Sequence, residues 1–541
     1  MSSHAGLDPE GRADGVDQSR RQFLTRAMAL GLAVPTLGGV LAACSSGDGG
    51  SGGGGFQKNK ATGGATGTAK KFTGTLVIST VANPPKGAQQ ALTAAYKKVQ
   101  PGVDIVWDTQ DFSGSDAYTQ FLTTQLAATN PHADFVSGVY SKTYRGYVDL
   151  DQYQGTTNPY THDQWSQDID FQRGGSRNAL GQLYQVATGL SHLNWIYNKD
   201  MFDKAGVQPP TTWDEFVTVC SKLKASGVTP IAANYQWIVP QWLTEIYFDQ
   251  YHVDWVQTVR AHKGDWDFNP DLDGKFTYNP ADGAIHSKYT YNPQRFWQGI
   301  QNKTLRFDTP EMAELAGNLA KIFPKYATSD FFVMTDPYPS LLKGQVAMIT
   351  ADATTLNTLA TDFKSKSVKK FTPGTFENPA MQSSLVKSKP RAVEPKGGDY
   401  VSIIKKNTQQ AAMAVDFAMF WLSKAGYQPY MDAEIKAGTT VGTMGVQGLT
   451  FPAAIQERND SVKFVGNAEV TLNQIWTAGA DPTSMADLHN LLKNALQGKV
   501  TPKGYATALQ KYFQSNFDTM IGKLSLTKDD INNPSRRPSA S

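Results

Sequence analysis

The sequence predicts an α/β fold of two lobes, and two observations lead to this prediction. Short apolar runs alternate with amphipathic stretches along the chain, which is typical of sheets covered by helices. In addition, about 450 residues lie between the first apolar run and the polar C-terminal end, more than one hydrophobic core usually spans.

The first lobe is predicted from five elements in the order βαβαβ. We expect strands over 75–80, 103–109 and 133–138, and helices over 87–100 and 118–129. This order favours an open, mostly parallel sheet with helices on both faces.

A second set of elements follows the first. Extended chain is expected over 183–198, with strands over 228–234, 345–350 and 399–406. Helices are expected over 201–206, 213–226, 310–326 and 408–426. Thr212 is the predicted N-cap of the second helix, Pro310 lies in the first turn of the third, and the last is expected to end on Gly426.

Residues 235–307 differ from the rest in their aromatic content. Five tryptophans fall there, namely Trp237, Trp242, Trp255, Trp266 and Trp297. We expect an elaborated loop region that covers the mouth of a site.

The N-terminal residues resemble an export signal with a lipid-attachment site. Arg20 and Arg21 precede an apolar run from Ala27 to Ala43, which ends at Cys44. This run is too short and too rich in Gly and Pro for a membrane span of roughly 20 apolar residues. It resembles a twin-arginine signal joined to the lipobox of bacterial lipoproteins, which implies that Cys44 is lipidated. Secretion by the unfolded route is the alternative.

The two ends of the chain are predicted to lie outside the folded part. Residues 45–71 are nearly all Gly, Ser, Thr, Ala and Lys, so we expect a flexible tether before Phe72. The final segment, INNPSRRPSAS, is expected to form a frayed tail.

The net charge argues against a nucleic-acid-binding protein, and the cysteine count argues against a protein stabilised by a disulfide. The formal net charge is +3 over 541 residues with no long run of either sign, which argues against nucleic-acid binding. Lipidation of Cys44 leaves Cys220 without a disulfide partner. Cys220 recurs at helical spacing with Trp213 and Phe216, which predicts a buried apolar role.

Residues 183–216 read LYQVATGLSHLNWIYNKDMFDKAGVQPPTTWDEF. This segment resembles the signature of family 1 extracellular solute-binding proteins, the group that includes the maltose-binding protein. A strand that ends at 197–200 is followed by a short helix that stops at Gly206. Thr212 and Glu215 can then form a capping box at the next helix. Segments 341–352 and 397–431 are similar to the same family.

The resemblance extends from residue 72 to about 517 and implies a periplasmic-binding-protein-like fold. In that fold a ligand cleft lies between two lobes joined by a multi-strand hinge, here expected around 186–191 and 399–404 with a third crossing near Val441. The implied division is a signal over 1–44, a tether over 45–71, lobe 1 over 72–188 and 405–440, lobe 2 over 189–404 and 441–520, and a C-terminal tail over 521–541.

Sugar sites combine exposed aromatic rings with planar polar side chains, because sugars have flat C–H faces and a rim of hydroxyls. Loops at the strand ends of open α/β sheets are where such groups gather. The candidate ligand-binding residues in these loops are Asn83, Asp108, Asp111, Tyr140, Trp237, Asp352, Asp399 and Tyr400. Each candidate also has a purely structural interpretation, for example Trp237 as a packing residue, Asp352 as a helix cap and Asn83 as a turn residue.

A metal site is weighed at the spacing Asn269-x-Asp271-x-Asp273-Gly274, which resembles the first half of a calcium loop. The glutamate expected at the twelfth loop position is absent, and Pro280 stands there. A polar turn is the preferred interpretation, and no metal is assigned.

The sequence therefore predicts a monomeric binding protein without catalytic residues or a cofactor. The resemblance implies that it captures a mono- or oligosaccharide and delivers it to the permease subunits of an ABC importer. A lipid anchor would hold it at the outer face of the cytoplasmic membrane. A surface enzyme that acts on carbohydrate and a receptor for a sensor kinase are the alternatives. Relatives that bind polyols, peptides, polyamines or metal complexes leave the ligand open.

Overall fold

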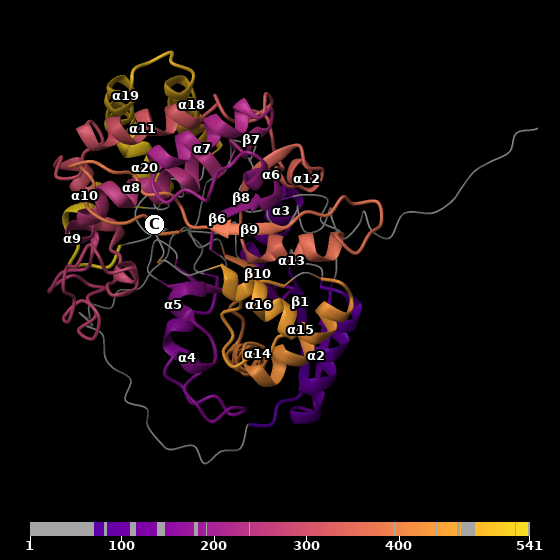
Figure 1. Cartoon of the computed structure of the whole chain (residues 1–541). Helices are drawn as coiled ribbons and strands as arrows, with labels where there is room; N and C mark the ends of the chain where they lie inside the picture. Colours follow the sequence, from indigo (N-terminus) through magenta and orange to yellow (C-terminus); the bar gives the residue numbers. More distant parts are fainter. Residues whose placement is uncertain are drawn as a thin grey trace, which may run out of the picture.

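The computed structural model describes residues 70–80, 84–108, 115–137, 146–177, 182–190, 192–236, 238–392, 396–439, 441–462, 466, 482–524 and 526–538. These residues form two lobes, each built on its own sheet and its own main hydrophobic core. Figure 1 shows most helices of the first lobe low in the view and most helices of the second lobe above them.

The first lobe contains a six-stranded sheet in the order β2-β1-β3-β10-β5-β4. The strands are β1 (Gly74–Ser79), β2 (Val103–Trp107), β3 (Phe135–Val136), β4 (Gly175–Arg177), β5 (Leu183–Leu190) and β10 (Lys396–Ile403). Only β1, β2 and β3 are parallel to one another, whereas β10 and β4 pair antiparallel with their neighbours. The expected mostly parallel sheet is thus confined to the βαβαβ unit, because β10 enters from the second lobe and needs no parallel crossover.

Helices cover both faces of this sheet. They are α2 (Lys86–Val99), α3 (Ser115–Ala127), η1 (Leu150–Tyr153), α4 (Trp165–Asp168), α5 (Phe171–Gly174), α14 (Thr408–Trp421) and α15 (Lys424–Lys436). Leu76 and Ile78 of β1 pack in one cluster with Phe417 of α14, while Val136 packs in a second cluster with Tyr118 of α3. Side chains that alternate along a strand point to opposite faces, so two apolar surfaces need two sets of helices.

The expected helix end at Gly426 is wrong. Helix α14 already ends at Trp421, and Gly426 lies in the first turn of α15. A Cβ atom at this position would come within 2.3 Å of the Phe420 carbonyl oxygen. Gly426 therefore permits the close approach of two helices rather than stopping one of them.

The second lobe contains a four-stranded sheet in the order β7-β8-β6-β9. The strands are β6 (Asn194–Asn198), β7 (Thr229–Ala232), β8 (Val346–Ala351) and β9 (Pro373–Phe376). Trp195 and Tyr197 of β6 pack in the largest hydrophobic core, whereas Ile196 between them packs in a smaller core on the opposite face. Both faces of this sheet are therefore buried as well.

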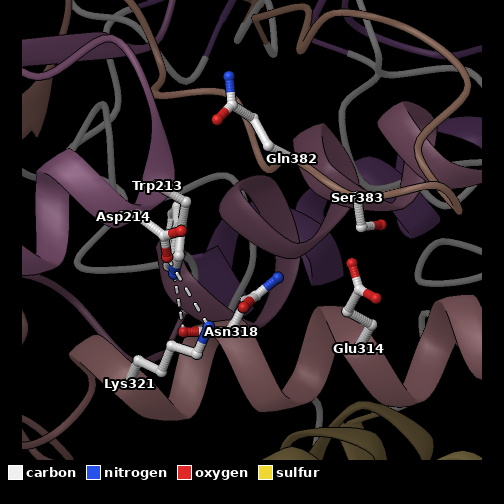
Figure 2. A pocket seen from close by; sticks show the side chains of 7 residues that line it. All are labelled: Trp213, Asp214, Glu314, Asn318, Lys321, Gln382 and Ser383. Carbon is white, nitrogen blue, oxygen red and sulfur yellow. Dashed lines mark hydrogen bonds and ion pairs between the residues drawn. The ribbon is translucent and has the colours of Figure 1, made fainter.

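The largest core lies between this sheet and a group of helices. The helices of the second lobe include α6 (Lys199–Lys204), α7 (Trp213–Ala225), α11 (Pro310–Ile322), α12 (Tyr338–Leu342), α13 (Ala353–Asp362), α16 (Ala453–Ser461), α18 (Pro482–Leu496), α19 (Pro502–Ser515) and α20 (Phe517–Lys523). The predicted capping box of Thr212 and Glu215 is confirmed at the start of α7. Trp213 Nε1 then donates to the Asn318 carbonyl oxygen at 3.0 Å, which joins α7 to α11 (Figure 2).

Residues 261–284 are irregular, as expected, but the rest of the loop region expected over 235–307 contains several short helices. They are η2 (Ile238–Leu243), α8 (Thr244–His252), η3 (Val253–Trp255), α9 (Val256–Val259), η4 (Ile285–Ser287) and α10 (Pro293–Gln301). Trp255 and Trp297 are buried in the largest core. Their aromatic rings thus stabilise the lobe from inside, and an interpretation of them as loop residues over a site is wrong.

A buried charge cluster fixes this region to the rest of the second lobe. The carboxylate of Asp249 lies 2.6 Å from His286 Nε2 and 2.6 Å from Arg391 Nη1, and all three side chains are buried. Burial raises the pKa of Asp249, but His286 and Arg391 outweigh it and hold the pKa below its ordinary value. Arg391 also donates to the carbonyl oxygens of Pro280 and Asp282. One arginine thereby joins three separate stretches of chain.

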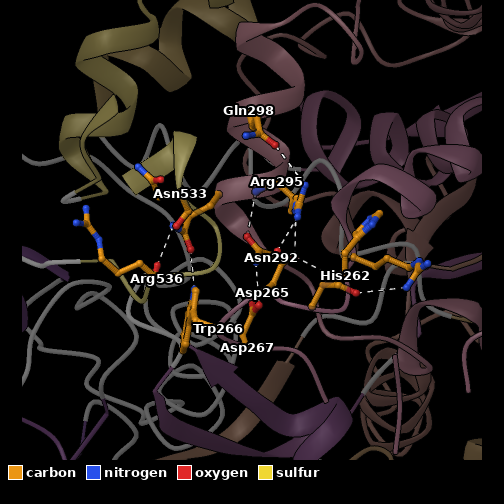
Figure 3. Close-up of polar contacts among 12 residues, drawn as sticks. His262, Asp265, Trp266, Asp267, Asn292, Arg295, Gln298, Asn533 and Arg536 are labelled. Carbon is orange, nitrogen blue, oxygen red and sulfur yellow. Dashed lines mark hydrogen bonds and ion pairs between the residues drawn. The ribbon is translucent and has the colours of Figure 1, made fainter. Parts of the chain in front are cut away.

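The C-terminal residues pack against the same region, contrary to the frayed tail expected from their composition. Helix α21 (Lys528–Asn532) buries Ile531 completely. Gln294 Nε2 donates to the Asp530 carbonyl oxygen, and Trp266 N donates to the Pro534 carbonyl oxygen at 3.0 Å. Figure 3 shows labelled residues from both sides of this contact, with Asn292, Arg295 and Gln298 on one side and Asn533 and Arg536 of the chain end on the other. Backbone carbonyls satisfied by side chains of another element hold the segment in place.

Cys220 is fully buried, and burial raises the pKa of its thiol, which confirms its predicted apolar role. Among the residues described, no helix combines the length and the apolar character needed to cross a membrane.

Candidate functional site

Three stretches of chain connect the two lobes next to β5. The first connection runs from β5 through residues 192–193 to β6. The second leaves the second lobe after residue 392 and enters β10. Residues 443–445 lie along β5, where Leu190 N donates to Thr443 O and Gly445 N donates to Thr188 O. On the other side, Asn357 Nδ2 of α13 donates to the Val441 carbonyl oxygen at 2.9 Å. These stretches place the ends of the two sheets in one region.

The carboxyl ends of β1, β2 and β3 carry polar groups that are bonded to one another. Asp108 Oδ2 accepts from Ser79 Oγ at 3.2 Å and lies 3.5 Å from His132 Nε2. The Tyr118 hydroxyl donates to the Ser79 carbonyl oxygen and accepts from Ser137 N at 2.6 Å. Because Tyr118 is fully buried, it fixes the end of β1 relative to the end of β3. The predicted residue Asp108 thus lies on a rigid polar edge of the first sheet.

Two polar side chains that were not predicted lie at the end of β7. Asn234 Nδ2 donates to Thr335 O at 2.6 Å, and Asn234 Oδ1 accepts from Gln236 N at 2.6 Å. The neighbouring Asp336 is half-buried and accepts from Tyr338 N at 3.0 Å. Burial raises the pKa of Asp336 above its ordinary value. A carboxyl group at this strand end can form hydrogen bonds with a ligand.

Asp352 follows β8 and caps α13. Its Oδ1 accepts from Thr355 N at 3.0 Å and from Thr355 Oγ1 at 3.3 Å, which confirms the alternative interpretation as a helix cap. The second carboxylate oxygen has no hydrogen-bond partner among the described residues. Ligand contact through that oxygen stays a prediction.

Asp399 and Tyr400 lie on β10, and the structure places both in the interior of the first lobe. Asp399 Oδ1 accepts from the Tyr430 hydroxyl at 3.1 Å, and Oδ2 accepts from the Tyr427 hydroxyl at 3.3 Å. Asp399 N donates to Thr188 Oγ1 of β5 at 2.9 Å. Through this network Asp399 links β10 to β5 and to α15. Contact of Asp399 or Tyr400 with a ligand stays a prediction.

Arg173 and His192 are further polar residues beside the connection. Arg173 Nη2 lies 3.1 Å from His192 Nε2, and His192 is buried two residues after β5 ends. The guanidinium is partly exposed, with 28% of its side chain accessible. An arginine here offers a planar set of donors to a ligand.

The other predicted residues lie outside the described residues. These are Asn83, Asp111, Tyr140 and Trp237, together with the lipidation candidate Cys44.

The calcium-like loop is a polar turn, as the sequence favoured. Asp273 Oδ2 accepts from Asn269 N at 2.9 Å, and Asp273 Oδ1 accepts from Thr290 N at 2.8 Å. Asn269 Oδ1 accepts from Asp271 N, which closes the turn. In the described part of the chain, no group of three or more His, Cys, Asp or Glu residues gathers as metal ligands would.

Sequence reasoning missed Asn234, Asp336 and Arg173 for different reasons. Asn234 directly follows a predicted strand, so the rule that selected Asp352 could have found it. Asp336 and Arg173 precede or lie in helices of 5 and 4 residues, which carry no periodic pattern to place them.

Residues 79–428 match the family model of the bacterial extracellular solute-binding protein. This range includes nearly all of both sheets. It also includes every one of the predicted ligand-binding residues.

Curated relatives are similar over shorter stretches. A probable sugar-binding periplasmic protein of Rhizobium meliloti (strain 1021) is 42% identical over 57 residues, which is 10% of this chain and 14% of the relative. The melibiose/raffinose/stachyose-binding protein MelE of Bacillus subtilis (strain 168) is 24% identical over 253 residues, 44% of this chain and 51% of the relative. The matches thus span about half of these relatives' length or less.

Solved structures share the fold. A chitin oligosaccharide binding protein matches with a TM-score of 0.53 at 16% identity, over 82% of this chain and 98% of that protein. A cyclic alpha-maltosyl-1,6-maltose binding protein from Arthrobacter globiformis matches with a TM-score of 0.50 at 16% identity, over 82% of this chain and 99% of that protein.

Proposed function

The chain belongs to the bacterial extracellular solute-binding protein family, and we propose that its solute is a mono- or oligosaccharide that it delivers to an ABC importer. The lobes would close on the sugar, and the closed form would be the one that the permease subunits recognise. The protein would bind the sugar without chemical change to it and without a cofactor.

The observation that carries this proposal is the arrangement of polar strand ends in two lobes joined by three stretches of chain. Asp108 of the first lobe, with Asn234, Asp336 and Asp352 of the second, supplies carboxylate and amide oxygens that pair with sugar hydroxyls. The names of several relatives, which refer to sugar binding, support the same solute class.

A thermal-shift screen against a solute library tests the solute class. A ligand present at 100 times its dissociation constant stabilises the folded state by roughly 2.7 kcal/mol. We expect a mono- or oligosaccharide to raise the melting temperature of the protein. The sugar itself should be recovered chemically unchanged after incubation with the protein. Stabilisation by amines or peptides alone, or hydrolysis of a glycoside by the purified protein, would contradict the proposal.

Substituting Asp352 separates ligand contact from helix capping. Asparagine is as good an N-cap as aspartate, so Asp352→Asn should keep α13 intact and remove only the charge. We expect the affinity for the identified sugar to fall about tenfold at an unchanged apo melting temperature. The exposed Asp200→Asn is the matched control, with no expected effect on either quantity. Unchanged affinity in Asp352→Asn would limit this residue to capping.

We further propose that Cys44 carries a lipid anchor at the outer face of the cytoplasmic membrane. The proposal is supported by the small residues before Cys44, by the apolar run that precedes them and by the paired arginines Arg20 and Arg21. Cys44→Ala should abolish lipid labelling and release the protein from the membrane fraction. Full lipid labelling of this variant would refute the anchor.

A further inference from the structure

A pocket of about 260 Å³ lies on the second lobe between the start of α7, the middle of α11 and residues 382–383 (Figure 2). Its lining is polar apart from one aromatic residue, and consists of Trp213, Asp214, Glu314, Asn318, Lys321, Gln382 and Ser383. None of these residues belongs to the polar strand ends described above, so the pocket is separate from the proposed sugar site.

A buried tyrosine fixes the floor of the pocket. The Tyr251 hydroxyl of α8 donates to Glu314 Oε1 at 2.7 Å and accepts from Asn318 Nδ2 at 3.2 Å. Tyr251 is fully buried, and burial together with the Glu314 carboxylate raises the pKa of its hydroxyl. The hydroxyl therefore stays protonated and holds both side chains of α11 in one orientation.

Two acceptors in this floor remain open. The second carboxylate oxygen of Glu314 and the amide oxygen of Asn318 have no hydrogen-bond partner among the residues that the structure describes. Asn318 is only 8% exposed, so its amide oxygen can meet a partner only through the pocket. The pocket therefore presents two oxygen acceptors to a ligand group that donates hydrogen bonds.

The charges of the lining add a preference for a cation. Asp214 lies 3.9 Å from Lys321, and both side chains are largely exposed, so these two charges offset each other. Glu314 has no ion-pair partner within the described part of the chain. One unpaired negative charge thus remains at the floor, close to the open amide oxygen.

A second sugar site does not fit this geometry. Trp213 is only 2% exposed, and its ring packs edge to face against Phe216 and Tyr247 with centroids 5.5 and 4.8 Å away. The indole therefore offers no open face on which a sugar ring could stack.

We propose that this pocket binds a single guanidinium or ammonium group. Glu314 and the Asn318 amide oxygen accept its hydrogen bonds, and the charge of Glu314 selects a cation over a neutral group of the same shape. The group belongs either to a basic side chain of a partner protein or to a small free amine. This inference is independent of the sugar proposal.

Calorimetric titration of the purified protein at low salt tests the pocket with matched probes. N-acetyl-L-arginine amide represents a side chain, agmatine represents a free amine, and N-acetyl-L-citrulline amide is the neutral isostere of the first. We expect the arginine compound to bind about tenfold more tightly than the citrulline compound. Agmatine carries a second positive charge, so only stronger binding of agmatine that persists at high salt would identify a free amine as the source of the group. Equal affinity for the arginine and citrulline compounds would overturn the proposal.

Variants assign the effect to the pocket. Glu314→Gln keeps the size and one acceptor but removes the charge, and should weaken binding of the arginine compound about tenfold. Asn318→Leu keeps a similar size but removes the open amide oxygen, and should also weaken binding. Glu311→Gln, one turn earlier on α11 and outside the pocket lining, should bind as wild type does. Unchanged affinity in both Glu314→Gln and Asn318→Leu would refute the assignment, and the second variant decides the matter if the first fails to fold.

Discussion

Individual buried histidines make the stability of this protein depend on pH. His252 is 3% exposed, and its ring stacks on Phe248 at 4.3 Å. Burial, assisted by the nearby Lys387, lowers its pKa to about 4. An unfolded histidine takes up its proton near pH 6.5, so between pH 6.5 and 4 the unfolded state binds more protons than the folded state. Stability is therefore lost as the pH falls through this interval.

We expect the His252 contribution to cost roughly 1 kcal/mol of unfolding free energy between pH 7 and pH 5.5. His252→Gln, which cannot be protonated, should show a correspondingly smaller drop in melting temperature over this pH range. His162→Asn alters an exposed histidine and should keep the wild-type pH dependence. Identical pH dependence in His252→Gln and wild type would show that His252 is not the source.

The role of an individual residue could be predicted from the sequence where it depends only on neighbouring residues. The capping box of Thr212 and Glu215 depends on four consecutive residues, and it was predicted correctly. Asp399 has partners 28 and 31 residues further along the chain, on α15. No pattern within β10 reveals them, so its interior position could not be predicted.

The junction of α14 and α15 shows how one glycine determines the packing of an element. In Gly426→Ala the new Cβ would meet the Phe420 carbonyl oxygen at 2.3 Å, which is backbone and cannot move aside. We expect this substitution to lower the unfolding free energy by about 1 to 3 kcal/mol.

Gly522→Ala provides the matched control for that prediction. Gly522 also lies in a helix, α20, but no atom comes within 4 Å of a Cβ built there. Alanine should raise stability by roughly 0.5 to 1 kcal/mol at this position. Urea unfolding of both variants measures the two effects, and a loss at Gly426 no larger than the change at Gly522 would contradict the proposed close approach.

At the scale of elements, most predicted helices and strands exist in the structure. Strands such as β1 and β8 are apolar runs that only a sheet interior accommodates, so periodicity was sufficient to place them. The direction of β10 was not predictable in the same way. Pairing between β10 and β5 joins residues about 210 positions apart, and the antiparallel direction follows from the path of the whole chain.

The end of the chain is tied into the second lobe, and this contact affects the whole molecule. Ile531 is fully buried at the docked segment, so Ile531→Ala should cost about 2 kcal/mol or more and release the segment. Trypsin should then cleave after Arg536 faster than in wild type, whereas the bond after Arg537 resists trypsin because Pro538 follows it. The exposed Asn532→Ala should leave the cleavage rate unchanged. Rapid cleavage of the wild type would show that the segment is not held.

The two-lobed architecture was predicted at the scale of the molecule, whereas the contents of the second lobe were not. Its aromatic region lacks a strong helical period, and its polar residues suggested a loop. In the structure Asp249 is buried with His286 and Arg391, because ionic groups of opposite charge can be buried when they pair. Composition alone could not indicate that these polar residues lie in the interior.

The pairing of β3 with β10 has a consequence for synthesis on the ribosome. About 260 residues separate the end of β3 from the start of β10, so the first sheet lacks this strand until about three quarters of the chain have been made. At roughly 5 to 20 residues per second, the wait lasts on the order of 13 to 50 seconds. Throughout that time the apolar faces of β1 and α2 have no α14 or α15 to cover them. The nascent chain is therefore expected to be a substrate for chaperones, and a route that exports only folded protein could accept it only after translation has passed residue 436.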